Sequence, residues 1–125
     1  MMYQQDWLMR QIEAISAVIA YLLTGKKAKS ASLEEAITEA AQSDPFYRHL
    51  SELVRQGQIC EAENELFAAT QDEKADVLQT AMMFYAGINK LSDKELEEHN
   101  FSRKEILDGI RDICAVYNVQ FDLLL

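Results

Sequence analysis

Proline and glycine are scarce in this sequence of 125 residues, which contains one proline and four glycines. Both residues are strong signals for turns, so the chain has few of the breaks that a fold of many short strands requires. Alanine, leucine, glutamate and glutamine are frequent, and these residues favour helices. The composition and the length therefore predict a single all-α domain over residues 1–125.

Basic residues are outnumbered by acidic ones, and the formal net charge is -9. The imbalance is strongest in residues 31–76, which contain eleven acidic and three basic side chains. A negative field repels nucleic acid and anionic lipid, so we expect neither nucleic acid nor a membrane as a partner. The uncharged run at residues 14–25 is too short to span a bilayer. The acidity suits solubility, or a basic protein partner.

Cysteine and histidine, the usual metal ligands, occur only twice each. Cys60 and Cys114 belong to no motif, and we expect both thiols to be free, buried and reduced, as in a cytoplasmic protein. Glu95 and His99 could face one ion, but a zinc site needs three or four ligands. His49 is expected to be a partly buried, hydrogen-bonded side chain. We therefore expect no metal.

Motifs of the common enzyme classes are also missing. The sequence has no nucleophile elbow, zinc-protease motif, paired CxxC or dinucleotide-binding glycine pattern. The pair Gly25-Lys26 lacks the glycine-rich loop and the following hydroxyl residue of a phosphate-binding loop. These observations predict a protein that is not an enzyme, with no cofactor and no catalytic residues.

Apolar residues recur at helical spacing along most of the chain. Such a stripe predicts a long first helix over about 3–24. Four Ser/Thr-x-x-Glu patterns are typical of capping boxes at helix starts, and Asp44 followed by Pro45 is a further N-cap signal. The boxes pair Ser32 with Glu35, Thr70 with Glu73, Ser92 with Glu95, and Ser102 with Glu105. The later helices are predicted over about 33–42, 45–56, 59–69, 73–89, 93–98 and 103–117.

The segment from Phe46 to Ala69 resembles one tetratricopeptide hairpin. Gly57 falls at the turn between its two helices, and Ala62 at a position where the repeat has a small residue. A second copy is not evident, because Leu91 stands where the next turn glycine would fall. The resemblance implies six or seven helices in tetratricopeptide-like antiparallel hairpins, packed on the long N-terminal helix.

Three further segments, Tyr3–Ile12, Leu91–Leu96 and Asn100–Ile106, carry a resemblance over the full length of the chain. Through them the chain resembles a family of small, uncharacterised helical proteins from Gram-positive bacteria. That family brings no established activity. The resemblance implies a bacterial, cytoplasmic protein.

The predicted function is protein–protein interaction by a non-catalytic scaffold or adaptor, because stacked helical hairpins leave a concave face for a partner. Tyr47 and Phe67 lie off the inward stripes of their predicted helices. With His49 they form the candidate partner groove.

Two alternatives remain open at this point. One is a small-molecule or metal-binding regulatory protein with a pocket near His49 or His99. The other is an obligate structural homodimer formed through the first helix and the apolar C-terminal tail. The candidate dimer surface comprises Phe121, Leu123, Leu124 and Leu125.

Overall fold

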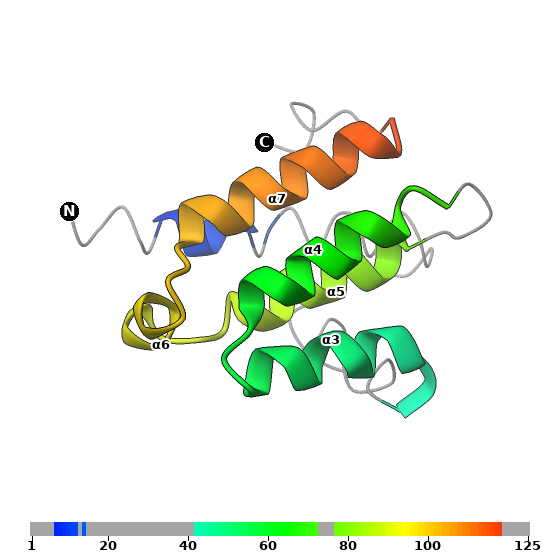
Figure 1. Ribbon diagram of the computed structural model, residues 1–125. Helices are drawn as coiled ribbons and strands as arrows, with labels where there is room; N and C mark the ends of the chain where they lie inside the picture. The colour runs from blue at the N-terminus through cyan, green and yellow to red at the C-terminus, as the bar shows by residue number, and fades with distance from the viewer. Residues whose placement is uncertain (1–6, 13, 15–41, 73–76, 119–125) are drawn as a thin grey trace.

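The computed structural model describes residues 7–12, 14, 42–72 and 77–118, and these residues form helices joined by turns, with no strand among them (Figure 1). Residues 7–12 form helical turns. Five further helices have defined bounds: α3 (Pro45–Arg55), α4 (Ile59–Ala69), α5 (Leu78–Ile88), α6 (Asp93–Glu98) and α7 (Arg103–Val116). The prediction of an all-α protein is confirmed. Most of the predicted first helix and nearly all of the helix predicted over 33–42 lie outside the described residues, as does the Ser32 capping box.

Helix α3 begins and ends at the residues that the sequence indicates. The Asp44 Oδ1 atom accepts hydrogen bonds from the backbone amides of Phe46 at 3.0 Å and Tyr47 at 3.1 Å. At the other end, Gly57 has a φ of +81°, a left-handed conformation that glycine adopts without steric cost. The Gln58 amide then donates to the Leu53 carbonyl at 2.8 Å, which closes the helix end.

Capping boxes begin α6 and α7, as predicted. The Ser92 hydroxyl accepts from the Glu95 amide at 3.1 Å, and the Glu95 carboxylate accepts from the Ser92 amide at 3.1 Å. Ser102 and Glu105 make the same reciprocal pair, at 3.2 and 2.8 Å. Each box satisfies two backbone amides that would otherwise lack a partner at a helix start.

The capping box predicted at Thr70 is wrong. Thr70 follows the last residue of α4, and its hydroxyl donates to the Phe67 carbonyl at 2.6 Å, so this side chain ends a helix. The sequence predicts a helix over 73–89; residues 73–76 lie outside the described residues, Val77 is not helical, and α5 begins at Leu78. The Ser/Thr-x-x-Glu pattern at Thr70 predicted a helix start, whereas Thr70 lies at a helix end.

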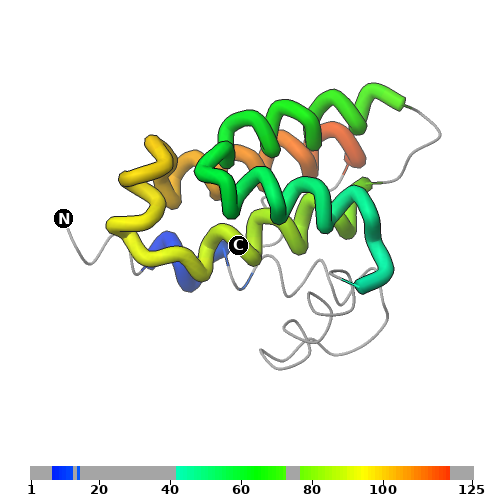
Figure 2. Tube along the Cα trace, turned by 60° about the horizontal axis from the view of Figure 1, so that its bottom comes forward, coloured from blue at the N-terminus to red at the C-terminus, as the bar shows by residue number. Residues whose placement is uncertain are grey.

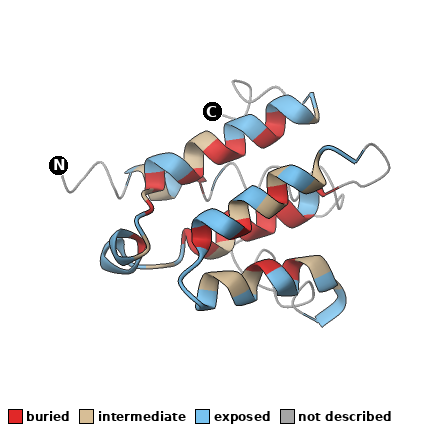
Figure 3. Ribbon diagram, viewed as in Figure 1, coloured by how far each residue is buried: buried red, intermediate tan, exposed pale blue. Residues whose placement is uncertain are grey.

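Helix α5 is the centre of the described fold. Nine of its eleven residues are buried, and they lie all around the helix axis. Helices α3 and α7 pack against α5, and α3 also packs against α4. Figures 1 and 2 show α3 and α4 side by side and running in opposite directions, and Figure 3 shows their buried residues as stripes. The core is therefore built around α5.

A buried arginine joins the segments on either side of α6. Arg103 is almost fully buried, and its guanidinium donates to the carbonyl of Asn89 at 2.7 Å, to the Asn89 Oδ1 atom at 2.9 Å and to the Leu91 carbonyl at 2.7 Å. The Arg103 Nε atom also donates to Asp93 at 3.2 Å. Asn89 in turn donates from Nδ2 to the carbonyl of Met9 at 3.2 Å. This network holds the start of α7, the turn after α5 and the N-terminal helical turns together.

Candidate functional site

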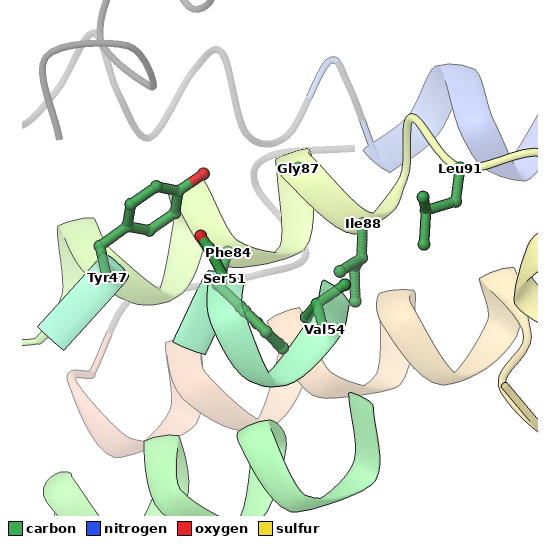
Figure 4. A pocket seen from close by; sticks show the side chains of 7 residues that line it. All are labelled: Tyr47, Ser51, Val54, Phe84, Gly87, Ile88 and Leu91. Atoms are coloured by element: carbon green, nitrogen blue, oxygen red, sulfur yellow. The ribbon is translucent and has the colours of Figure 1, made fainter. Parts of the chain in front are cut away.

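A pocket of about 150 Å³ lies between α3 and α5, and we call it the α3–α5 pocket (Figure 4). Helix α3 contributes one wall and α5, with the turn that follows it, contributes the other. Its lining residues are Tyr47, Ser51, Val54, Phe84, Gly87, Ile88 and Leu91. This hollow is the candidate functional site.

Helical spacing brings these side chains together. On α3, Tyr47, Ser51 and Val54 are separated by four and three residues, so they share one face of the helix. On α5, Gly87 leaves the wall without a side chain opposite Tyr47. A Cβ atom at Gly87 would lie 3.5 Å from the Tyr47 hydroxyl, which is ordinary van der Waals contact. The missing side chain at Gly87 therefore makes part of the hollow.

The chemistry of the α3–α5 pocket is apolar and uncharged. Val54, Phe84 and Ile88 contribute apolar side chains to its lining, and Tyr47 and Ser51, both on α3, contribute hydroxyls (Figure 4). Burial raises the pKa of Tyr47, although a hydrogen bond with Ser51 offsets part of this effect. The phenol stays neutral at physiological pH. The pocket is thus suited to an apolar group with one polar atom near its rim.

The size of the α3–α5 pocket limits what it can hold. Pockets for metabolites and cofactors usually enclose roughly 300–1,000 Å³. An apolar cavity of about 150 Å³ holds a molecule the size of benzene. At 150 Å³, the α3–α5 pocket has room for one leucine or phenylalanine side chain.

The three residues of the predicted partner groove do not share a site. Tyr47 lines the α3–α5 pocket, and it is nearly buried because α3 packs on α5 as well as on α4. His49 instead faces α4, where its Nε2 atom lies 2.8 Å from the Glu65 carboxylate. Phe67 is partly buried and packs against the main core. The prediction that Tyr47 lies off the inward stripe is wrong.

Other predicted residues lie as follows. His49 is hydrogen-bonded as predicted, but its side chain is 51% exposed, so the prediction of partial burial is wrong. Both thiols are free and Cys114 is buried, as predicted, but Cys60 is exposed, so the prediction of its burial is wrong. The four residues of the predicted dimer surface, Phe121, Leu123, Leu124 and Leu125, lie outside the described residues.

The described residues contain no group of three or more histidine, cysteine, aspartate or glutamate side chains placed to hold a metal ion. The His99 Nδ1 atom is buried without a hydrogen-bond partner among them, but the residue as a whole is only partly buried. Within the same part of the chain, no helix has the length and apolar character that crossing a membrane would require.

Sequence reasoning missed Gly87, Ser51 and Leu91 as site residues. Gly87 carried a possible signal, because it interrupts an apolar helix where alanine would be more stable. Ser51 carried none, since a serine at the edge of an apolar stripe is common. Leu91 follows the end of α5, so it belongs to no helical stripe.

Comparison with known proteins identifies a family and no characterised relative. No curated protein and no solved structure matches the chain. One family model matches residues 2–118. That match covers nearly the whole chain, and the family has no assigned function. The chain therefore belongs to DUF6483, a family of unknown function.

Proposed function

We propose that this protein is a non-catalytic protein-interaction domain, a small scaffold or adaptor, and that the α3–α5 pocket receives one apolar side chain of its partner. The observation that carries this proposal is the pocket itself, which is apolar, uncharged and about 150 Å³ in volume. Protein interfaces commonly depend on a few buried anchor side chains. A single leucine or phenylalanine on a partner helix or extended segment is such an anchor.

The hydroxyls of Tyr47 and Ser51 give the proposed site its directional contacts. A partner backbone that passes the wall formed by α3 can exchange hydrogen bonds with these two groups. The net charge of -9 favours a partner with basic residues beside its anchor, because opposite charges speed association. The proposed partner therefore presents one apolar anchor side chain with basic residues beside it.

The hairpin of α3 and α4 supports the same proposal. Helices α3 and α4 are antiparallel and are joined by a short turn in which Gly57 has the left-handed conformation, and we propose that they form a tetratricopeptide-like hairpin. Proteins built from such hairpins bind partners on exposed helix faces. A cytoplasmic protein of Gram-positive bacteria remains part of the proposal, as the resemblance of the sequence implies.

The experiment is a selection of short peptides from a random displayed library on the purified full-length chain. We expect peptides with one leucine or phenylalanine anchor and nearby lysine or arginine. Their binding is then compared with that of Gly87→Leu, which fills the α3–α5 pocket, and of Gln79→Leu, which adds the same side chain at an exposed position of α5. Gly87→Leu should abolish binding, and Gln79→Leu should retain it.

Circular dichroism spectra and thermal midpoints show whether both variants remain folded. If a folded Gly87→Leu variant binds the selected peptides as well as the original chain, the pocket is not the binding site. If the selected peptides share no apolar anchor, the proposed mode of recognition is wrong.

A thermal-shift panel of metals and metabolites tests the regulatory alternative, and light scattering at micromolar concentration tests the homodimer.

A further inference from the structure

A glutamate lies at the junction of three helices, on a part of the fold that the α3–α5 pocket does not include. The Tyr85 hydroxyl of α5 donates to the Glu63 Oε2 atom of α4 at 2.7 Å. Tyr85 is fully buried, and its ring lies against Gly109 of α7 so closely that a Cβ atom at that position would overlap it. Glu63 is partly buried as a result.

Two acidic residues of α7 stand on either side of Gly109. Glu105 and Asp112 lie four residues before and three residues after it, so all three share one helix face. The negative charges of Glu105 and Asp112 both act on Glu63. From α5, the ionisable group that acts on it is Tyr85. We call Glu63, Tyr85, Glu105, Gly109 and Asp112 the Glu63 junction.

Two basic residues of α7, Lys104 and Arg111, form ion pairs with Asp108. Lys104 lies 3.8 Å from Asp108, and Arg111 lies 3.5 Å from the same carboxylate. Neither is among the groups whose charge acts on Glu63. Within the described part of the chain, an ionised Glu63 therefore faces the like charges of Glu105 and Asp112, and a hydrogen bond from Tyr85 favours its charge.

The placement of α4 makes this contact important for α7. The closest backbone packing in the described fold joins α3 to α4, α3 to α5, and α5 to α7. Helix α4 has few close backbone approaches to α7. The hydrogen bond between Glu63 and Tyr85 joins α4 to α5, and the Tyr85 ring carries this link on to α7, because it lies against Gly109.

We propose that the Glu63 junction is a proton-dependent contact: a protonated Glu63 lets α7 pack firmly on α4 and α5, and an ionised Glu63 weakens that packing by repulsion from Glu105 and Asp112. The proton comes from water and returns to it, and no other bond is made or broken. The neutral carboxyl group still accepts the hydrogen bond from Tyr85. This inference is independent of the proposed function.

The direction of the pH effect follows from the direction of the pKa shift. Burial first, and then Glu105 and Asp112, raise the pKa of Glu63 above the ordinary value for glutamate. Above roughly pH 4.3 the folded state therefore holds a proton that the unfolded state has lost. The stabilising contribution is complete below that pH and is lost as the pH rises through the raised pKa.

The test is hydrogen exchange of α7 amides, measured on the full chain at several pH values from 4 to 8 and corrected for intrinsic exchange rates. In the unmodified protein, protection of α7 should fall as the pH rises. Glu63→Gln keeps an acceptor for Tyr85 but has no charge, so its α7 protection should change little with pH. Glu61→Gln removes an exposed charge from the same helix and should follow the unmodified protein.

A direct NMR titration of the Glu63 side-chain carboxyl group provides the second measurement. Its midpoint should coincide with the loss of α7 protection and lie above the ordinary value for glutamate. The proposal is overturned if Glu63→Gln shows the same pH dependence as the unmodified protein. It is also overturned if Glu61→Gln removes that dependence equally, because net acidity would then be the cause.

Discussion

Arg103 and Asn89 form a buried pair in which one guanidinium nitrogen, Nη1, donates to both the carbonyl and the side-chain oxygen of the same asparagine, at 2.7 and 2.9 Å. The two residues are fourteen positions apart, and α6 lies between them. The side-chain Nδ2 atom of Asn89 donates to the Met9 carbonyl. The pair thus joins three parts of the chain through hydrogen bonds.

Replacing Arg103 by methionine should destabilise the protein by about 3–5 kcal/mol, because the buried acceptors of Asn89 and Leu91 would lose their donors. The side-chain volume is nearly kept, so most of the loss is polar. The stability of Arg103→Lys should lie between that of the unmodified protein and that of Arg103→Met, since lysine cannot donate in the same planar fork. Urea unfolding monitored by circular dichroism measures the change. Arg55→Met, at an exposed arginine on α3, should change stability by less than about 1 kcal/mol.

Gly109→Ala should destabilise the protein by about 1–3 kcal/mol, because the new methyl group overlaps the buried ring of Tyr85. Gly87→Ala is the matched change on α5. Its methyl group would make only ordinary van der Waals contact with the Tyr47 hydroxyl. The better helix propensity of alanine should therefore leave stability equal or slightly higher. Thermal unfolding of the two variants distinguishes them. Equal midpoints would contradict the close approach of α5 and α7.

Asp44 and Thr80 should show coupled effects on stability. The Asp44 Oδ1 atom caps α3, and the Thr80 hydroxyl donates to its Oδ2 atom at 2.6 Å. Asp44→Ala removes both contacts and should cost about 1–3 kcal/mol, whereas Thr80→Val removes one. A double-mutant cycle should give a coupling energy of about 0.5–3 kcal/mol. Additive effects would show that the two side chains act independently.

The two cysteines should differ strongly in their reaction with an aromatic disulfide reagent near pH 8. Cys60 is exposed on α4, so its thiol should react at once in the folded protein. Cys114 is buried, and burial raises the pKa of its thiol, so its reaction should wait for unfolding. Absorbance of the released thiolate measures both rates. Cys60→Ser should lack the fast phase, and a fast phase in that variant would contradict the burial of Cys114.

Local patterns predicted the helix ends well where the partner of each end group is close in sequence. Ser92 with Glu95 and Ser102 with Glu105 each complete a cap within four residues, and Asp44 does so within three. The start of α5 depends on a distant group instead. The Val77 amide donates to the hydroxyl of Tyr117 at 3.0 Å, forty residues away, and no local pattern contains that information.

The candidate site was predicted only in part, for a related reason. Tyr47 was chosen because it was expected to lie off the inward stripe of its helix, which is wrong. The wall opposite Tyr47 comes from α5, and the sequence does not show which helices are neighbours. Arg103 stands in the first turn of α7, and no local pattern in the sequence predicts its burial. Its burial depends on Asn89 and Asp93, which approach it only when α6 folds back.

The contact between Gly109 and Tyr85 also restricts how this sequence can diverge. Because a Cβ atom at position 109 cannot coexist with a tyrosine ring at position 85, a larger residue at 109 requires a smaller one at 85. The hydrogen bond to Glu63 would then lose its donor, and a carboxylate at position 63 would no longer have a hydrogen-bond partner at position 85. Positions 63, 85 and 109 should therefore covary as a group among members of the family.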